Sequence, residues 1–529
     1  MRTLTLAAAL AASPTVALAC GGLFCNTTQP VNQAAERILF ARDGERVQMH
    51  VRLTWSGPPQ DFGWLLPVPP DVETTVSSEA LFSLLDQAYG PQFQLIDQFE
   101  DCGDRASNFI DAAASPDLGA ADAGAGGGVN VLSREQVGPY DRAILQGESV
   151  DELITWLTDN AYQVPPGAAE TLTPYVELGA AFVAIKLVPG ADSSEVVPLA
   201  LSFTASGPAI PLRPTANAAD PDMGVIVHIL GENRAIPVNF RHVQINEAAI
   251  EWTNGGQNYP DVVSQAADEA NGRAFATDYA GPVTNALPPV VDLARLGEVP
   301  DWDAVRGALN LADPDLQRVV GAVITDPGSA GDVATVLACP FCYEDVVVDG
   351  AALAARITEE INPPRTALAD LFATHRYLTR LYTTLSPAEM DTDPIFDENP
   401  DLTDVSNLRT ATRFVPCGEF GPDFSQATIE TASGLRFRQV DGSNPDAIQR
   451  QDGQTVRGQD VPAAAVIEQG LVAGQFEILD DRRGTLSDRY RVETARGDDD
   501  CDGCSSTTTG GTGLAVLLLA LFRPRRRVR

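Results

Sequence analysis

The sequence predicts a disulfide-stabilised α+β fold, in which β-rich N-terminal and C-terminal parts flank a mainly helical middle region. Two observations predict this class. Short segments with strand-like spacing of apolar residues lie toward both ends, and capped segments with helical spacing lie between them. Eight cysteines in 529 residues add a disulfide framework if the chain is exported. A hydrophobic content of 44% is ample for large cores, and the length suggests about three domains.

Antiparallel strands are predicted at the start of the folded part. Residues 38–42 form a strand-like run, and Asp43-Gly44 is a hairpin signal. Residues 47–55 then alternate strictly between apolar and polar side chains, with His50 on the polar face. This alternation is typical of a strand that is buried on one face only.

Prolines, capping residues and glycines mark the next elements. Residues 62–69 are predicted to form an edge strand, because their prolines limit pairing. Ser78 caps a predicted helix, and Ser149 forms a capping box with Glu152 at the start of another. The segment 103–137 is rich in alanine, glycine, aspartate and serine, which indicates a flexible insertion.

The rest of the chain completes the predicted organisation. Further strands are expected at 181–188, 196–203 and 225–230, and helices at 260–280, 351–360 and 366–385. Pro363-Pro364 is expected to separate the last two helices. The predicted parts are a signal peptide (1–19), a β-rich α+β domain (20–250), a mainly helical region (251–412), a small β-rich region (413–495) and a C-terminal anchor or sorting segment (496–529).

The N-terminus predicts export. Arg2, an apolar stretch and small residues ending at Ala19 have the layout of a secretory signal peptide. Cleavage there makes Cys20 the first mature residue, which raises lipidation as an alternative. A lipobox prefers leucine where Ala17 stands, so ordinary cleavage is expected.

The C-terminal segment has the layout of an anchor or address. An acidic run ends at Gly503-Cys504, a Thr/Gly spacer follows, and the apolar run 510–522 leads into a cluster of arginines. A permanent transmembrane helix needs roughly 20 apolar residues, so this run is short. The arginines would stay cytoplasmic, leaving the upstream chain outside. The layout resembles the myxobacterial C-terminal sorting signal, which implies cleavage near the cysteine and display at the cell surface. A short membrane anchor is the alternative.

The cysteines outside the tail predict disulfides. Local pairs and one long-range pair are one arrangement among those that the sequence allows: Cys20–Cys25, Cys339–Cys342 and Cys102–Cys417. Cys339-Pro-Phe-Cys342 also resembles a glutaredoxin-type redox site, whose first cysteine lies at a helix N-terminus. Carboxylates and strand-like residues follow it here, which favours a structural disulfide.

The charge balance excludes some partners. A formal net charge of −36 repels nucleic acid and anionic lipid, so membrane contact is expected only through the C-terminal segment. One acidic stretch offers carboxylates for calcium, although a solvated loop is the commoner outcome and EF-hand spacing is missing. The candidate calcium ligands are Asp391, Asp393, Asp397 and Asp401. No other cofactor is predicted.

The histidines carry no familiar catalytic motif. The chain has four of them: His50, His228, His242 and His375. His375 is expected on the buried face of a helix. The zinc-protease, nucleophile-elbow and P-loop patterns do not occur. A hydrolase that combines His228 or His242 with a distant serine is an alternative that nothing in the sequence supports.

Several ordered blocks resemble one bacterial family. They include CGGLFC at 20–25, DFGWLLPVP at 61–69, VGPYD at 137–141, PDMGVIVHILG at 221–231 and DEANGRAFATDYAG at 268–281. Together they resemble the bacterial domain of unknown function 2330, over about residues 20–415. The resemblance implies a secreted or surface protein, and it brings no assigned catalytic residue.

The expected function is a non-catalytic role at the bacterial cell surface or envelope, in binding, adhesion or structure. Its partners would be the export and processing machinery and a surface ligand. An extracytoplasmic enzyme is the first alternative, either a hydrolase or a thiol–disulfide oxidoreductase using Cys339 and Cys342. That alternative predicts a reactive thiolate or a Ser/His pair converging in a pocket. A calcium-stabilised structural module is the second alternative.

Overall fold

A computed structural model describes most of the chain upstream of the tail. The described residues are 33–52, 62–102, 130–189, 196–217, 219–284, 287–297, 299–439, 447–449, 455–457 and 461–490. They all belong to one compact unit, Met1–Val492. The predicted signal peptide, Cys20, Cys25 and the predicted sorting segment with Gly503 and Cys504 lie outside the described residues.

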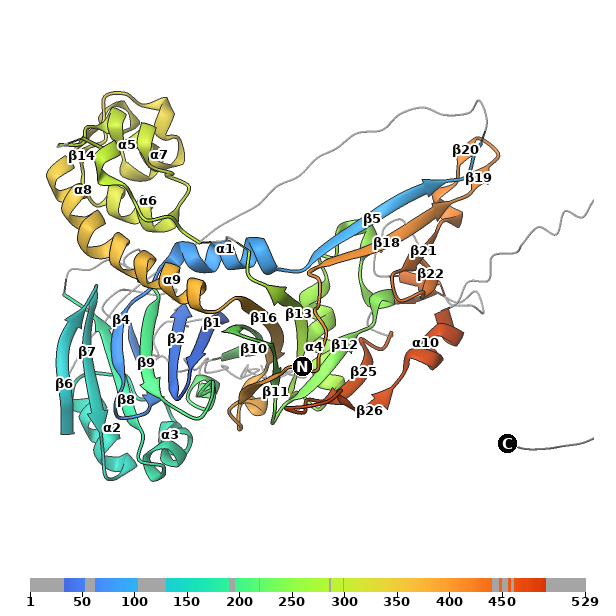
Figure 1. Cartoon of the computed structure of the whole chain (residues 1–529), viewed down its shortest axis with the longest axis horizontal. Coiled ribbons are helices and arrows are strands. Elements are labelled where there is room, and N and C mark those ends of the chain that lie inside the picture. Colours follow the sequence, from blue (N-terminus) through green and yellow to red (C-terminus); the bar gives the residue numbers. More distant parts are fainter. Residues whose placement is uncertain are drawn as a thin grey trace, which may run out of the picture. The chain divides into compact units, whose positions relative to one another are not determined.

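The fold is α+β and is built on a ten-stranded mixed sheet (Figure 1). In spatial order its strands are β26 (Glu477–Asp481), β25 (Ala464–Gln469), β12 (Arg241–Ile245), β13 (Ala274–Pro282), β16 (Tyr377–Leu385), β10 (Ala219–Gly231), β1 (Gln33–Asp43), β2 (Arg46–Arg52), β9 (Leu199–Thr204) and β4 (Glu73–Val76). They come from all three regions predicted between residues 20 and 495. The boundaries expected near 250 and 412 therefore fall inside one shared sheet.

A four-stranded sheet packs against one face of the large sheet. Its order is β3 (Gly63–Val68), β8 (Ala181–Leu187), β7 (Tyr140–Gln146) and β6 (Asn130–Val137). Apolar side chains from both sheets form the largest core, including Phe40, Met49 and Trp64. Helices α2 (Val150–Asp159) and α3 (Ala168–Glu177) bury the outer face of the small sheet. Because β6 begins at Asn130, the insertion predicted over 103–137 is wrong for its last eight residues.

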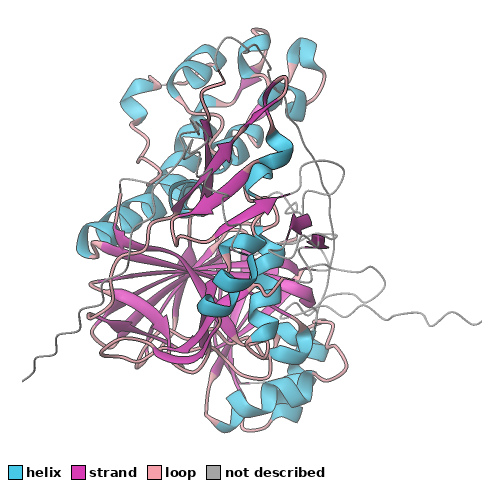
Figure 2. Ribbon diagram, turned by 90° about the vertical axis from the view of Figure 1, so that its right-hand side faces the viewer, coloured by secondary structure: helices cyan, strands magenta, loops and turns pink. Residues whose placement is uncertain are grey.

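Two helices cover the opposite face of the large sheet (Figure 2). They are α1 (Glu79–Tyr89), which Ser78 caps, and α9 (Asn362–Thr374). Because of this layer, the prediction that the strand of His50 is buried on one face only is wrong at His50. His50 lies on that face of β2 opposite Leu39, so it is buried rather than exposed to solvent.

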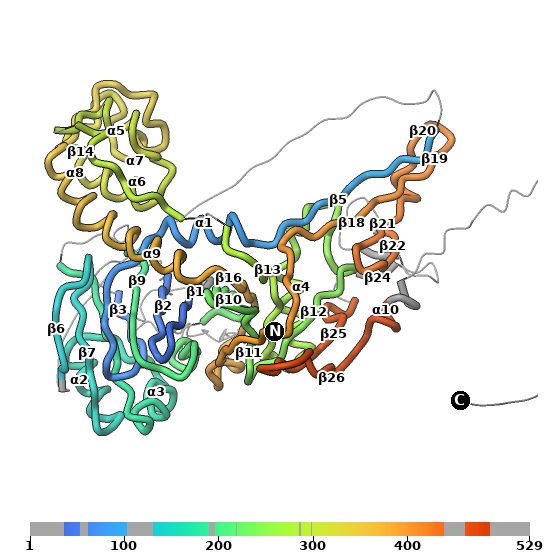
Figure 3. Tube along the Cα trace, viewed as in Figure 1, coloured from blue at the N-terminus to red at the C-terminus, as the bar shows by residue number. Residues whose placement is uncertain are grey.

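A six-stranded sheet joins distant parts of the chain. Its order is β24 (Thr455–Arg457), β23 (Ala447–Gln449), β22 (Arg436–Gln439), β21 (Thr428–Thr431), β18 (Leu408–Val415) and β5 (Gln92–Phe99). The blue β5 and the orange β18 run parallel and side by side in Figure 3. Helix α4 (Tyr259–Glu269) packs in the core shared with β12, β13 and β25. The short elements are β11 (Arg234–Pro237) with β17 (Phe396–Asn399), β14 (Ile324–Asp326) with β15 (Val347–Val348), β19 (Cys417–Gly418) with β20 (Gly421–Pro422), and α10 (Arg483–Tyr490).

The middle region is less helical than predicted. Its helices α5 (Trp302–Ala308), α6 (Pro314–Gly321), α7 (Val333–Ala338) and α8 (Gly350–Arg356) share a core of their own. The prediction of one helix over 260–280 is wrong, because α4 is followed there by a left-handed turn and β13. The helix predicted over 366–385 is also wrong in its second part, where the end of α9 is followed by β16. Pro363-Pro364 does not break the helix, because the prolines lie in the first turn of α9 after a π-helical segment, Ile357–Ile361.

The disulfide Cys102–Cys417 ties the end of β5 to the end of β18 across a separation of 315 residues. Replacing both cysteines by serine should lower the free energy of unfolding by about 2–4 kcal/mol, since the unfolded chain regains loop entropy. Urea unfolding of the oxidised protein measures this loss. The matched control is the double serine variant at Cys339 and Cys342, which are only 3 residues apart. An equal or larger loss for the control would contradict the expectation.

Candidate functional site

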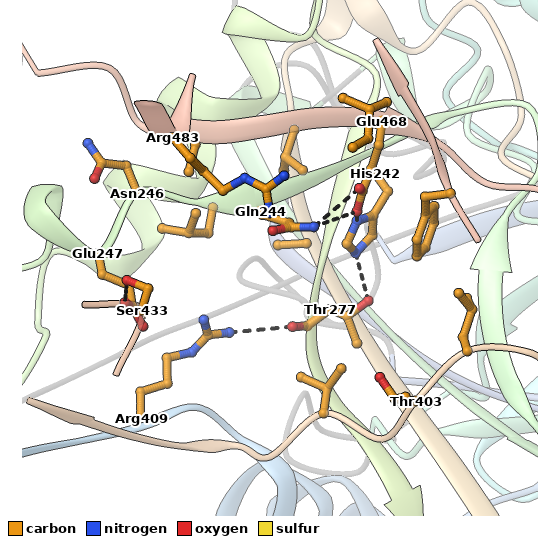
Figure 4. A pocket seen from close by; sticks show the side chains of 18 of the residues that line it. His242, Gln244, Asn246, Glu247, Thr277, Thr403, Arg409, Ser433, Glu468 and Arg483 are labelled. Carbon is orange, nitrogen blue, oxygen red and sulfur yellow. Dashed lines mark hydrogen bonds and ion pairs between the residues drawn. The ribbon is translucent and has the colours of Figure 1, made fainter. Parts of the chain in front are cut away.

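A large cavity lies where β11, β12, β13, β18, β25 and α10 meet. Its volume is about 580 Å³. Many of the side chains that line it are polar or charged, among them Arg234, His242, Gln244, Thr277, Arg409, Glu468 and Arg483. Figure 4 shows several of these side chains turned toward one another across the cavity, which we call the arginine pocket.

Strand register brings His242 and Glu468 together. In the antiparallel pair of β12 and β25 the two residues stand directly opposite each other. Along β12, Val243 and Ile245 face the core with α4, so His242 and Gln244 point the other way, into the pocket. His242 Nδ1 lies 2.8 Å from Glu468 Oε1, and Gln244 Nε2 donates to both Glu468 oxygens at 3.2 Å. The carboxylate is therefore fully engaged.

A β-bulge in β13 presents Thr277 to the same pocket. The register of β13 against β16 shifts between Thr277 and Tyr279. Thr277 Oγ1 meets His242 Nε2 at 2.8 Å, while the next side chain, Asp278, is completely buried and pairs with Arg380. The bulge thus directs two consecutive polar side chains to two different environments.

Arg234 is a buried cation whose acidic neighbour, Glu468, acts on it without a direct ion pair. Its Nη2 donates to Thr277 Oγ1 at 3.1 Å and its Nη1 to the carbonyl oxygen of Thr403 at 3.3 Å. The guanidinium lies 5.4 Å from the centre of the Phe476 ring. The residue is only 8% exposed, its Nε has no hydrogen-bond partner, and it makes no ion pair with any carboxylate of the described residues. Burial lowers the pKa of Arg234.

The other arginines of the pocket are better compensated. Arg409 donates to the carbonyl oxygen of Thr277 at 3.4 Å and lies 3.9 Å from an oxygen of Asp278. Arg483 is exposed and pairs with Asp481 at 2.6 Å. Arg234 is therefore the member of the set whose charge is least satisfied.

The protonation states in the pocket follow from burial and from neighbours. Burial opposes ionisation of Glu468, but hydrogen bonds from His242 and Gln244 outweigh it and lower its pKa. Burial lowers the pKa of His242, and the charge of Arg234 adds to this effect, although Glu468 opposes it. At neutral pH we expect an ionised Glu468 beside a neutral His242.

The remaining histidines lie elsewhere. His228 is fully buried on β10, and burial lowers its pKa to about 3. Burial lowers the pKa of His50 to about 4, and its Nδ1 lies 2.8 Å from Ser77 Oγ. His375 ends α9 instead of lying within a helix as expected, because the chain turns there into β16.

The structure pairs Cys339 with Cys342, and Cys102 with Cys417, as in the arrangement considered from the sequence. Cys339 caps the C-terminal end of α7. A redox-active thiolate is favoured by the N-terminal end of a helix, where the dipole is positive. Cys339 also starts the three-residue 3-10 turn Pro340–Cys342, so no α-helix N-terminus stabilises its thiolate.

The four candidate calcium ligands each have separate partners. Asp391 pairs with Arg273, and Asp393 accepts hydrogen bonds from Tyr175 and backbone amides. Asp397 lies 3.6 Å from Arg42, and Asp401 accepts from the amide of Gly474. Within the described ranges, no three His, Cys, Asp or Glu side chains come together as a metal site. Likewise, no described helix is long and apolar enough to span a bilayer.

Sequence reasoning named His242 but missed Thr277, Glu468 and Arg234. The only available signal was a charged residue within an apolar strand, as in the run Ala464–Gln469 around Glu468. Such a residue must be paired when it is buried. The pairing partner, 226 positions away, is not visible in the sequence.

Comparisons with known proteins place the chain in a family. A solved structure of a mutated baculovirus P35 after caspase cleavage is similar over 40% of this chain and 76% of that chain, at 10% identity and a TM-score of 0.22, which is too low to support an argument. No curated protein matches. The family described as an uncharacterized protein conserved in bacteria, DUF2330, matches residues 14–394, a range that includes Arg234, His242 and Thr277. The chain therefore belongs to the DUF2330 family.

Proposed function

We propose that this chain is an exported protein of the bacterial envelope that binds a small carboxylate-bearing ligand in the arginine pocket. The observation that carries the proposal is Arg234, a guanidinium that is 8% exposed, lines the cavity and makes no ion pair with a carboxylate of the described residues. The charge of Glu468 acts on Arg234 without a direct ion pair, and an anionic ligand would supply a counter-charge in direct contact. Carboxylates suit a guanidinium because they accept two parallel hydrogen bonds.

The charge of the whole protein makes local recognition necessary. A net charge of −36 repels anions in general, so an anionic ligand needs a local positive field. Arg234 and Arg409 supply this field from β11 and β18, on either side of Thr277. Both acidic side chains of the pocket are already engaged: His242 and Gln244 hold Glu468, and Ser433 Oγ donates to Glu247.

Export and surface attachment belong to the same proposal. Two disulfides in the described part suit an oxidising compartment outside the cytoplasm. The signal-peptide layout that ends at Ala19 and the C-terminal layout around Cys504 support the same location. Intact mass of protein from its own cells tests this part. A chain that begins at Met1 and ends at Arg529 would contradict it.

Binding is tested by calorimetric titration of succinate into the wild type and into Arg234→Met, which keeps an unbranched apolar stem and removes the guanidinium and its charge. We expect succinate affinity to fall at least about tenfold, because a charge-assisted hydrogen bond is lost. The control is Arg134→Met, since Arg134 is an exposed arginine paired with Asp141 outside the pocket. Equal affinity in all three proteins, or no binding to the wild type, would contradict the proposal.

A further inference from the structure

We propose that Thr277, His242 and Glu468 form a catalytic triad that hydrolyses a carboxylic ester whose free carboxylate is held by Arg234. This inference rests on the proposed function and adds a reaction to it. It uses the same pocket but a different observation, namely the hydrogen bonds that connect Thr277, His242 and Glu468.

The hydrogen bonds allow one arrangement of protons. An ionised Glu468 only accepts, so His242 Nδ1, at 2.8 Å, must carry the proton. His242 Nε2 is then an acceptor, and the Thr277 hydroxyl at 2.8 Å donates to it. Arg234 Nη2 only donates, and it meets the same Thr277 oxygen at 3.1 Å. The chain thus runs from Arg234 through Thr277 and His242 to Glu468, with the hydroxyl proton directed at the imidazole.

This is the arrangement that activates a hydroxyl as a nucleophile. A neutral imidazole can take the proton from the hydroxyl, and an acidic residue at its other nitrogen fixes the tautomer and stabilises the imidazolium that forms. The imidazole is held in place by stacking on Phe476, with ring centres 4.6 Å apart and planes at 20°. His242, Thr277 and Glu468 all line the cavity of about 580 Å³, which has room for a small ester.

The reaction balances without any added oxidant or metal. Thr277 Oγ1 bonds to the ester carbonyl carbon while its proton moves to His242 Nε2, and the carbonyl electron pair moves onto oxygen. The guanidinium of Arg234, whose Nη2 lies 3.1 Å from Thr277 Oγ1, is close to that negative charge. The bond to the alcohol then breaks, and the alcohol leaves with the proton from Nε2. Water repeats the sequence on the acyl-threonine, giving a free acid and restoring the hydroxyl.

A second hydroxyl–histidine pair in the protein serves as an internal comparison. Ser77 Oγ lies 2.8 Å from Nδ1 of His50, both residues are buried, and neither lines the arginine pocket. Ser77→Ala therefore removes a similar buried hydrogen bond without touching the triad. A variant effect seen at Thr277 and not at Ser77 reports on the pocket rather than on general loss of packing.

The test compares hydrolysis of mono-4-nitrophenyl succinate, which carries a carboxylate, with hydrolysis of the uncharged 4-nitrophenyl acetate. We expect faster turnover of the succinate ester, a fall of at least about 100-fold in Thr277→Val, and unchanged activity in Ser77→Ala. Acid-quenched protein should carry one succinyl group on Thr277, a readout that a structural role would not give. The fall in rate at acid pH should occur below the usual pKa of histidine, since burial lowers the pKa of His242.

The outcomes separate the two proposals. Binding of succinate with ester turnover unchanged in Thr277→Val would overturn the triad alone. Turnover of 4-nitrophenyl acetate that depends on Thr277, without succinate binding, would overturn the anion site alone. If the wild type neither binds succinate nor shows turnover that depends on Thr277, the anion site and the triad are both overturned. Succinate binding, turnover that depends on Thr277 and a succinyl adduct together would establish the reaction.

Discussion

Replacing Arg365 by methionine is expected to lower the free energy of unfolding by about 3–5 kcal/mol, the largest effect of a single substitution that the structure predicts. Arg365 is 1% exposed, and its Nη2 pairs with Asp313 at 2.7 Å and with Asp315 at 3.3 Å. Asp315 in turn accepts hydrogen bonds from Ser78 and from the amide of Glu79, at the start of α1. Removing the cation leaves two buried carboxylates uncompensated.

The loss should be larger at pH 8 than at pH 5. Burial already raises the pKa of Asp313 although Arg365 opposes it, and without Arg365 that pKa must rise further. The folded variant then holds a proton that the unfolded chain releases as pH increases. Urea unfolding at both pH values measures the effect, with Arg134→Met as the exposed control, expected to cost at most about 1 kcal/mol. A loss at Arg365 no larger than that of the control would contradict the account.

Replacing Glu36 by glutamine should change the free energy of unfolding in the stabilising direction by up to about 3 kcal/mol more at pH 8 than at pH 4.5. Glu36 is 5% exposed, its Oε2 has no hydrogen-bond partner, and burial raises its pKa from 4.5 to about 7. Below pH 4.5 both folded and unfolded states are protonated, so ionisation contributes nothing. As pH rises from 4.5 to 7 the unfolded chain loses its proton while the folded state keeps it, which destabilises the wild type.

Glutamine has the same shape and does not ionise, so the difference in stability between variant and wild type isolates this effect. Urea unfolding at the two pH values measures it. The control is Glu73→Gln, because the Glu73 side chain is 78% exposed. A Glu36→Gln difference that is the same at pH 4.5 and at pH 8 would show that the carboxyl group ionises freely in the folded protein.

Local signals in the sequence predicted local structure well. The Asp43-Gly44 hairpin joins β1 to β2, and Ser78 and Ser149 cap α1 and α2. These features depend on residues a few positions apart, whose turn and capping chemistry is specific. Val47, Met49 and Val51 likewise face the large core, as their alternation predicts.

Long-range pairing accounts for the errors. Residues 377–385 were predicted to be helical, but they form β16 between β10 and β13, where the β-branched threonines fit a central strand. An apolar run of this length suits either structure, and only its distant neighbours decide. The candidate site could not be assembled from the sequence for the same reason. His242 is visible in the sequence, but Glu468 reaches it only because β25 pairs with β12.

The central claim is that the arginine pocket binds a carboxylate at Arg234. The most direct measurement is a crystal structure of the protein soaked with 4-bromobenzoate, whose bromine is located by anomalous scattering. The account predicts a bromine peak in the pocket and a carboxylate within hydrogen-bond distance of the Arg234 guanidinium, with neither in Arg234→Met. An empty pocket in crystals that bind 4-bromobenzoate elsewhere, or the same occupancy in Arg234→Met, would contradict it.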